Sequence, residues 1–205
     1  MSWLLLALLG TAEAANWGKT KPYVRPVLTG GVISVNGRTH AQATGGVVAG
    51  ATVRDRADPH WFSHTRGLAT GTYGLTTGNL GAQVRAGSFI GPDGKIFRYQ
   101  IGPDVFFDGY GQPGAEDLHL PWSPGVDIVN SLLVKLSKPL VLRGDLTPGW
   151  VFVPERQAKS VKPFHQLTAS AVAVLRTDAL RLTVGWQRSY NRAGVVDALI
   201  LSGAI

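Results

Sequence analysis

The stretch KIFRYQIGPDVFFD, residues Lys95 to Asp108, decides the fold class because its side chains alternate between apolar and polar. A period of two residues is that of a β-strand with one apolar and one polar face. The apolar face carries Phe97, Tyr99, Ile101, Val105 and Phe107, and the polar face carries Arg98, Gln100, Asp104 and Asp108.

Three further segments repeat this alternation: Gln42–Arg54, Leu140–Phe152 and Ala179–Tyr190. Stretches rich in Gly, Pro, Asn and Asp separate the segments and predict turns. Counting the segments predicts about ten strands, with eight as the alternative, and no long stretch has the helical period. We therefore expect an all-β fold, a closed antiparallel up-and-down β-barrel that spans a membrane. The turns are expected at Asn36-Gly37, Thr76–Asn79, Gly91–Gly94, Ser137–Pro139 and Arg176–Asp178.

The connections between these strands are expected to differ in length. Two long ones are predicted, from Gly109 to Gly125 and from Pro154 to Pro163. The connections that alternate with them are short, and so are the first and the third. Short turns at one end and longer loops at the other are typical of outer-membrane barrels. The short alternating connections lie around Ala57, Asp93, Lys138 and Thr177.

Composition limits the function classes. The chain has 205 residues, of which 44% are hydrophobic and only 16% charged, enough for one sizeable domain. It has no cysteine, so disulfides, thiolate metal sites and cysteine nucleophiles are excluded. The net charge of +7 is spread along the chain, which argues against nucleic-acid binding. Scattered positive charge suits an anionic lipid surface, including lipopolysaccharide, as a partner.

The N-terminus has the order of features of an export signal. The apolar run WLLLALLG, Trp3–Gly10, is too short to span a bilayer as a helix and is followed by Ala12-Glu13-Ala14. No Lys or Arg precedes the run, and a buried N-terminal helix or strand is the alternative. We predict a cleaved signal peptide over Met1–Ala14 and a single barrel domain over Ala15–Ile205.

Periodicity cannot decide which face of the barrel looks outward, so this expectation rests on the chemistry of the two faces. Aromatic rings near strand ends fit the girdles of a membrane barrel. A soluble barrel with its apolar face inward remains the alternative, and the chain end Ala204-Ile205 lacks the terminal aromatic residue of many outer-membrane barrels. The expected girdle residues are Trp61, Phe62, Tyr73, Phe89, Phe97, Phe107, Trp122, Trp150, Phe152, Trp186 and Tyr190.

The polar face is rich in Thr, Ser, Gln and Gly, with single Arg and Asp residues and little Lys or Glu. A narrow lumen favours Arg–Asp pairs that satisfy each other. We expect Arg98 to pair with Asp104, and Arg143 with Asp145. The candidate lumen network is Arg85, Arg98, Asp104, Arg143, Asp145, Arg181 and Gln187.

No catalytic residue, metal ligand or cofactor is predicted. The histidines lack metal-ligand spacing, and Ser63 and His64 would point to opposite faces of a strand. The segment Gln187–Gly194 resembles part of the outer-membrane lipid A deacylases in its Ser, Asn, Ala and Gly, but it lacks their histidine, so no catalytic role is transferred.

In its signal peptide, about ten amphipathic strands and unequal loops, the chain resembles small bacterial outer-membrane barrels of the outer-membrane protein A and W types. The resemblance implies an outer-membrane location and assembly by the barrel insertion machinery. It favours a non-enzymatic barrel with a structural, surface-binding or narrow-pore role. The alternatives are an enzyme that modifies lipid A or lipopolysaccharide, and a soluble periplasmic ligand-binding barrel.

Overall fold

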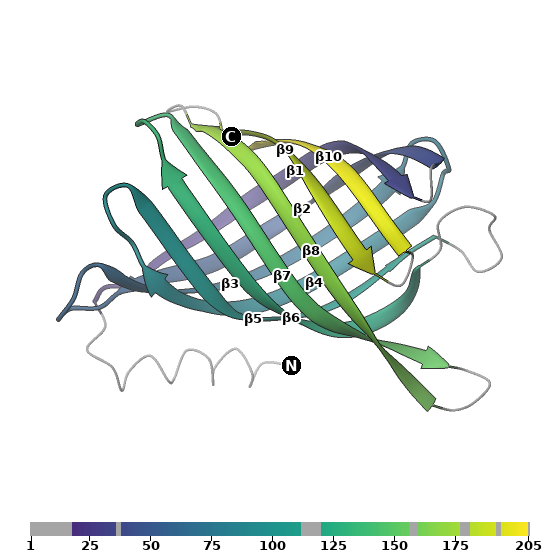
Figure 1. Ribbon diagram of the computed structural model, residues 1–205, viewed down its shortest axis with the longest axis horizontal. Helices are drawn as coiled ribbons and strands as arrows, with labels where there is room; N and C mark the ends of the chain where they lie inside the picture. The colour runs from purple at the N-terminus through teal and green to yellow at the C-terminus, as the bar shows by residue number, and fades with distance from the viewer. Residues whose placement is uncertain are drawn as a thin grey trace.

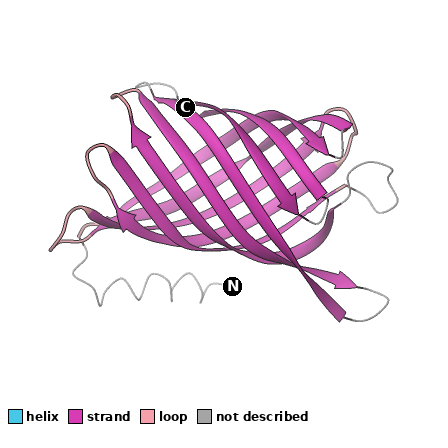
Figure 2. Ribbon diagram, viewed as in Figure 1, coloured by secondary structure: helices cyan, strands magenta, loops and turns pink. Residues whose placement is uncertain are grey.

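A computed structural model describes residues 18–35, 38–111, 120–155, 160–176, 181–191 and 194–204. Every strand pairs with its sequence neighbours, and the last strand pairs with the first, which closes the barrel (Figures 1 and 2). The closed antiparallel barrel of ten strands is therefore confirmed. The strands are β1 (Lys21–Val35), β2 (Arg38–Arg54), β3 (Trp61–Gly74), β4 (Leu80–Pro92), β5 (Phe97–Tyr110), β6 (Leu120–Lys135), β7 (Leu140–Glu155), β8 (Ser160–Arg176), β9 (Arg181–Asn191) and β10 (Gly194–Ala204).

Within the described residues, no helix is long and apolar enough to cross a bilayer. The predicted signal peptide, Met1–Ala14, lies outside the described part of the chain.

Strand β5 shows which face of the barrel is outside. The alternation predicted from its sequence is present: Val105 is 52% exposed, whereas its neighbour Asp104 is completely buried. The register carries the same facing to the adjacent strands, because Asp104 lies opposite Gly87 on β4 and Asp127 on β6. The apolar residues of the pattern thus face outward, and the polar residues face the interior of the barrel.

Two of the expected girdle aromatics face the opposite way. Phe62 and Phe89 are buried on the inner face, at 0% and 1% exposure. Their neighbours Trp61 and Ile90 are exposed on the outer face instead. The expectation for Phe62 and Phe89 was wrong because each adjoins a second large apolar residue, Trp61 or Ile90, so a period of two could not decide which of the two faces outward.

The two connections expected to be long are shorter than the sequence indicated. Strand β5 runs to Tyr110 and β6 starts at Leu120, while β7 ends at Glu155 and β8 starts at Ser160. In the first case, the ring of Trp122 stacks on Phe107 with centroids 5.7 Å apart and so extends the pairing of β5 with β6. Glycine and proline in these segments suggested loops, but proline fits extended backbone at a strand end.

The expected turns lie where they were predicted, as far as they are described. The turn at Thr76–Asn79 contains Gly78 with φ of +71°, a conformation that glycine adopts without strain. The turn before β5 starts at Asp93, because Gly91 and Pro92 belong to β4. Asn36-Gly37 lies outside the described residues, as does most of the turn after Arg176.

The seam between the first and last strands covers only part of β1. Pairing with β10 runs from Leu28 to Val35, whereas Lys21–Val27 pairs with β2 and with no described residue of β10. Pro22 and Pro26 lie in this half of β1. Because proline has no N–H to donate, it is tolerated at a strand edge and discourages pairing with another chain there.

Candidate functional site

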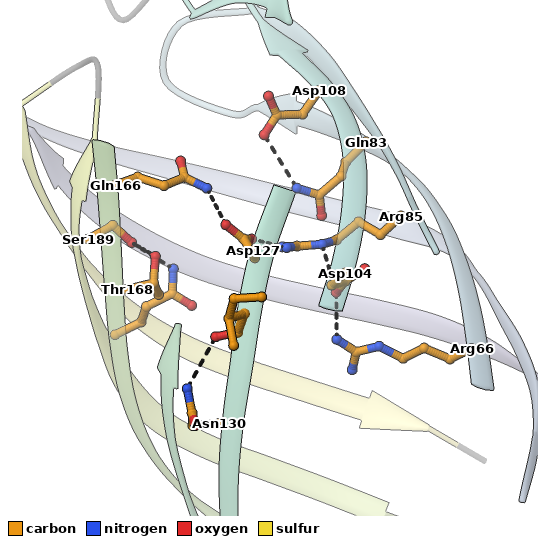
Figure 3. A network of polar contacts seen from close by, with 12 residues as sticks. Arg66, Gln83, Arg85, Asp104, Asp108, Asp127, Asn130, Gln166, Thr168 and Ser189 are labelled. Carbon is orange, nitrogen blue, oxygen red and sulfur yellow. Dashed lines mark hydrogen bonds and ion pairs between the residues drawn. The ribbon is translucent and has the colours of Figure 1, made fainter. Parts of the chain in front are cut away.

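The candidate site is a network of charged side chains inside the barrel, centred on Asp104 and Asp127 (Figure 3). Asp104 Oδ2 lies 3.0 Å from Nη2 of Arg66 and 3.2 Å from Nε of Arg85. Arg85 also forms an ion pair with Asp127, whose other carboxylate oxygen accepts a 2.7 Å hydrogen bond from Gln166 Nε2. One arginine therefore joins two buried carboxylates, and the network extends across strands β3 to β8.

The register explains how the network crosses from β6 to β8. Asp127 lies opposite Gly149 on β7, and Gly149 lies opposite Gln166 on β8. A side chain added at Gly149 would occupy the position of the Asp127 carboxylate. The glycine thus leaves the space through which Asp127 reaches Gln166.

Substitution of Gly149 tests this arrangement. Gly149→Ala is expected to lower the free energy of unfolding by about 2 kcal/mol, because its methyl group would displace Asp127 and meet the backbone oxygen of Val126. Gly144→Ala in the same strand is the control, since its methyl group would lie 3.8 Å from the nearest neighbour and change stability by less than about 0.5 kcal/mol. Urea unfolding of the folded barrel measures both. Equal losses for the two variants would contradict the proposed role of Gly149.

Inward phenylalanines support the arginines of the interior. The guanidinium of Arg66 lies 4.8 Å from the ring centroid of Phe89, and that of Arg85 lies 4.9 Å from that of Phe106. Cation–π contacts of this kind gain strength where water is partly excluded. The Phe106 ring in turn covers Gly125 on the neighbouring strand. The rings therefore hold each guanidinium in place and direct it toward its carboxylate.

A second cluster lies at the end of the barrel that carries the β2–β3 and β4–β5 turns. The Asp93 carboxylate accepts hydrogen bonds from Arg54 Nη2 at 2.6 Å, Arg98 Nη2 at 2.5 Å and Lys135 Nζ at 2.9 Å, and each is also an ion pair. Arg54 also donates to the backbone oxygen of Pro59, so the β2–β3 turn, the β4–β5 turn and the end of β6 are joined through one carboxylate. Burial alone would raise the pKa of Asp93, but the hydrogen bonds from Arg98, Lys135 and Arg54 hold it well below its ordinary value.

The structure gives Arg98 a different partner from the one expected. It pairs with Asp93 across the isolated bridge between these two residues, and its guanidinium lies 4.5 Å from the Phe62 centroid. Asp104 is taken by Arg66 and Arg85. The expected pair of Arg98 with Asp104 is wrong. Asp104 pairs with arginines of β3 and β4, and Arg98 pairs with a carboxylate in the turn before its own strand.

The other candidate residues lie in smaller contacts. Arg143 Nε is 2.8 Å from Asp145 Oδ1, and Asp145 also accepts from Ser170 Oγ at 3.0 Å. Gln187 Nε2 donates to Ser189 Oγ at 3.2 Å. The side chain of Arg181 lies outside the part of the chain that the structure describes.

Sequence reasoning missed several members of the interior clusters. Asp127 was placed just beyond an expected loop, and its strand β6 has apolar residues on both faces, so alternation gave little signal there. Arg66 lies on a strand with few apolar residues on either face. A search for isolated acidic residues inside otherwise apolar segments would have selected Asp127. The members not expected from sequence are Arg54, Arg66, Asp93, Asp127, Lys135 and Gln166.

The structure gives hydrogen-bond partners to two of the residues considered for catalysis or metal binding. His64 faces the interior, where its Nε2 lies 2.7 Å from the Tyr23 hydroxyl. Ser189, within the segment that resembles lipid A deacylases, is buried and shares a 3.0 Å hydrogen bond with Thr168. Among the described residues, no three His, Asp or Glu side chains are grouped as a metal site requires.

Comparison with known proteins adds a distant likeness to solved barrels. No family model and no curated protein matches the chain. The translocator domain of the autotransporter NalP from Neisseria meningitidis aligns with a TM-score of 0.36 at 7% identity, covering 99% of this chain and 94% of that one. The β domain of the Bordetella autotransporter Brka aligns with a TM-score of 0.36 at 7% identity, covering 89% and 98%. Likeness at this level does not transfer the function of those domains to this chain.

Proposed function

We propose that this chain is a β-barrel of the bacterial outer membrane whose narrow, positively charged lumen admits small anions. The observation that carries the proposal is the outer face of the described strands. Its positions are apolar, small or uncharged polar residues, and the ionised residues among them are Arg188 and Asp197, which pair with each other.

The extent of the apolar outer face supports membrane insertion. Large apolar side chains are exposed on every strand, for example Leu28 at 67% and Leu199 at 57%. Monomeric soluble proteins rarely expose contiguous apolar patches of more than a few hundred Å². A soluble ligand-binding barrel would need these side chains inside, where the structure has arginines and aspartates instead.

Aromatic residues lie toward both ends of this outer face. Trp61 and Phe97 flank the rim that carries Asp93, and Tyr73, Trp122 and Tyr190 lie toward the opposite rim. Aromatic girdles at two levels match the two interfaces of a bilayer.

The outward polar side chains of Asn130 and Tyr99 are satisfied within the sheet. The pairing of β6 with β7 is interrupted near Pro148, which has no N–H to donate. The Asn130 amide donates to the backbone oxygen of Leu146 at 3.2 Å, and its own oxygen accepts from Tyr99 at 3.1 Å. Hydrocarbon offers no hydrogen bonds, so such internal satisfaction is required of a strand that spans a bilayer.

The lumen carries more positive than negative charge. By strand alternation, basic residues outnumber acidic ones at the inward positions of the described strands. A barrel of this size is largely filled by its own side chains, which favours a narrow path over a wide pore. Fixed positive charge along such a path raises the local concentration of anions. Among the side chains that the structure describes on these strands, the basic residues are Lys21, Arg25, Arg38, Arg54, Arg66, Arg85, Arg98, Lys135, Arg143 and Lys162, and the acidic residues are Asp104, Asp108, Asp127 and Asp145. Asp93, in the turn before β5, adds one more carboxylate, which binds three of these basic residues.

Fractionation tests the membrane location. We expect the protein in the outer-membrane fraction, extractable by detergent and shifting on gels only after heating. Recovery of freely soluble, folded protein from the periplasm would overturn the proposal.

Conductance tests the pore. In planar bilayers under a KCl gradient, the reversal potential is expected to show preference for chloride, and Arg25→Glu is expected to lower the chloride-to-potassium permeability ratio at least about twofold. Arg56→Glu, in the exposed turn between β2 and β3, is the matched control and should leave the ratio unchanged. Absence of conductance from protein that still shows the heat shift would reject the pore and retain the barrel.

A further inference from the structure

One ion pair stands on the outer wall of the barrel, at the β9–β10 hairpin. Arg188 and Asp197 lie opposite each other in the register, and both point outward. Asp197 accepts hydrogen bonds from Arg188 Nε at 2.8 Å and Nη2 at 3.0 Å. The two side chains are 43% and 32% exposed, so the pair is open to whatever surrounds the wall.

The pair lies close to the rim of the barrel. Strand β9 ends at Asn191, three residues after Arg188, and β10 starts at Gly194, three residues before Asp197. At about 3.3 Å per residue along tilted strands, the pair lies within roughly 10 Å of the hairpin end. This depth corresponds to the headgroup region of a bilayer, where charged groups are far less costly than at its centre.

The hairpin belongs to the end of the barrel opposite the two chain ends of the sheet (Figure 1). The longest interval between strands, from Tyr110 to Leu120, is at this same end. Longer loops of membrane barrels face the exterior. Under the proposed outer-membrane location, the pair therefore faces the outer leaflet.

The chemistry of Arg188 suits a phosphate group. A guanidinium has five N–H donors in a planar fork, and the bond to Asp197 takes two of them. The Arg188 guanidinium also lies 5.5 Å from the centroid of the Trp186 ring. This contact limits the mobility of the guanidinium, and the ring lies on the side where acyl chains would lie. The Tyr190 side chain also contacts the guanidinium by a hydrogen bond. A phosphate of the leaflet can accept from the donors that Asp197 and Tyr190 leave, with acyl chains lying along the apolar wall below.

We propose that Arg188, which Asp197 and Trp186 hold in position, is a binding site for a phosphate of lipid A on the outer wall of the barrel. The proposal rests on the outer-membrane location but not on a conducting lumen. Arg188 contacts the phosphate, while Asp197 positions its guanidinium and competes with the lipid for its donors.

The test is lipid binding by the purified, folded barrel in detergent micelles, measured by native mass spectrometry. The probes are lipid A with both phosphates, the same lipid A after dephosphorylation, and phosphatidylglycerol. We expect the phosphorylated form to bind about tenfold more tightly than the dephosphorylated form. Arg188→Gln should reduce the affinity for the phosphorylated form to that for the dephosphorylated form.

A second variant separates phosphate binding from a structural role of the ion pair. Asp197→Asn removes the competing charge, so affinity for phosphorylated lipid A should rise several-fold. Arg56 is an exposed arginine at the opposite rim, and Arg56→Gln should leave the affinity for phosphorylated lipid A unchanged.

Three results would overturn the site. They are unchanged affinity in Arg188→Gln, equal weakening by Asp197→Asn and Arg188→Gln, and equal binding of phosphatidylglycerol and lipid A. Heat-shift gels confirm that each variant is folded. Fractionation of the unaltered protein reports separately on the membrane location, so failure of that proposal is distinguishable from failure of this one.

Discussion

Asp104→Ala is expected to lower the free energy of unfolding by about 3 kcal/mol, since breaking a buried ion pair from one side leaves the other charge uncompensated. Asp104 is completely buried, accepts a hydrogen bond from Arg66 and forms an ion pair with Arg85. After the substitution, Arg85 keeps Asp127, but Arg66 has no other carboxylate among its described contacts. Urea unfolding in lipid vesicles, followed by tryptophan fluorescence, measures the change.

Asp145→Ala is the matched control for this prediction. It removes the same atoms from a carboxylate that pairs with the single arginine Arg143 and keeps 15% exposure of its side chain. Solvent screens this pair more, so we expect a loss of about 1 kcal/mol. A loss as large as that of Asp104→Ala would contradict the central role assigned to Asp104.

A double substitution distinguishes the effect of the unpaired charge on stability from the effect of lost packing. Arg66→Met with Asp104→Leu removes both partners and keeps apolar volume beside Phe89. Replacement of a buried pair by apolar residues is often neutral, so the double variant should be at least about 1 kcal/mol more stable than Asp104→Ala. A double variant less stable than Asp104→Ala would show that packing, not the unpaired guanidinium, causes the loss.

Asp93→Asn is expected to loosen one rim of the barrel and to lower the free energy of unfolding by about 2 kcal/mol at neutral pH. The side chain of Asp93 is 3% exposed and binds Arg54, Arg98 and Lys135. Because these three cations are partly exposed, at 47%, 30% and 37%, water compensates for part of the lost charge.

The lowered pKa of Asp93 predicts how the stability difference between the protein and Asp93→Asn changes with pH. The hydrogen bonds from Arg98, Lys135 and Arg54 outweigh burial and hold the pKa of Asp93 below its ordinary value, so the folded state favours the carboxylate. The stabilisation is therefore fully present above the unfolded pKa of about 4 and is lost as pH falls toward the lower folded pKa. The difference between the protein and Asp93→Asn should be constant from pH 8 to pH 5 and shrink below pH 4.

Asp58→Asn is the control at the same rim. Asp58 Oδ1 accepts from the backbone N–H of His60, and the asparagine oxygen can accept the same bond. We expect a change of less than about 0.5 kcal/mol. A difference between the protein and Asp93→Asn that grows on acidification would contradict the ion-pair account of Asp93.

The sequence by itself determined the elements of this fold. Alternation over Lys95–Asp108 identified the two faces of a strand, and the turn residues between such segments indicated about ten strands, with eight as the alternative; the structure has ten. Arg143 and Asp145 were assigned to one face because residues two apart on a strand point the same way, and the structure brings them to 2.8 Å.

Tertiary structure alone decided which face is inside and which residues meet there. A period of two is the same for an inward and an outward apolar face, so only closure of the sheet could place Val105 outside and Asp104 inside. The partners of Asp104 are Arg66 and Arg85, which are far from it in sequence and adjacent to it through the register of β3, β4 and β5. Register and closure depend on pairings across the whole sheet, and for this physical reason no local pattern could specify the network.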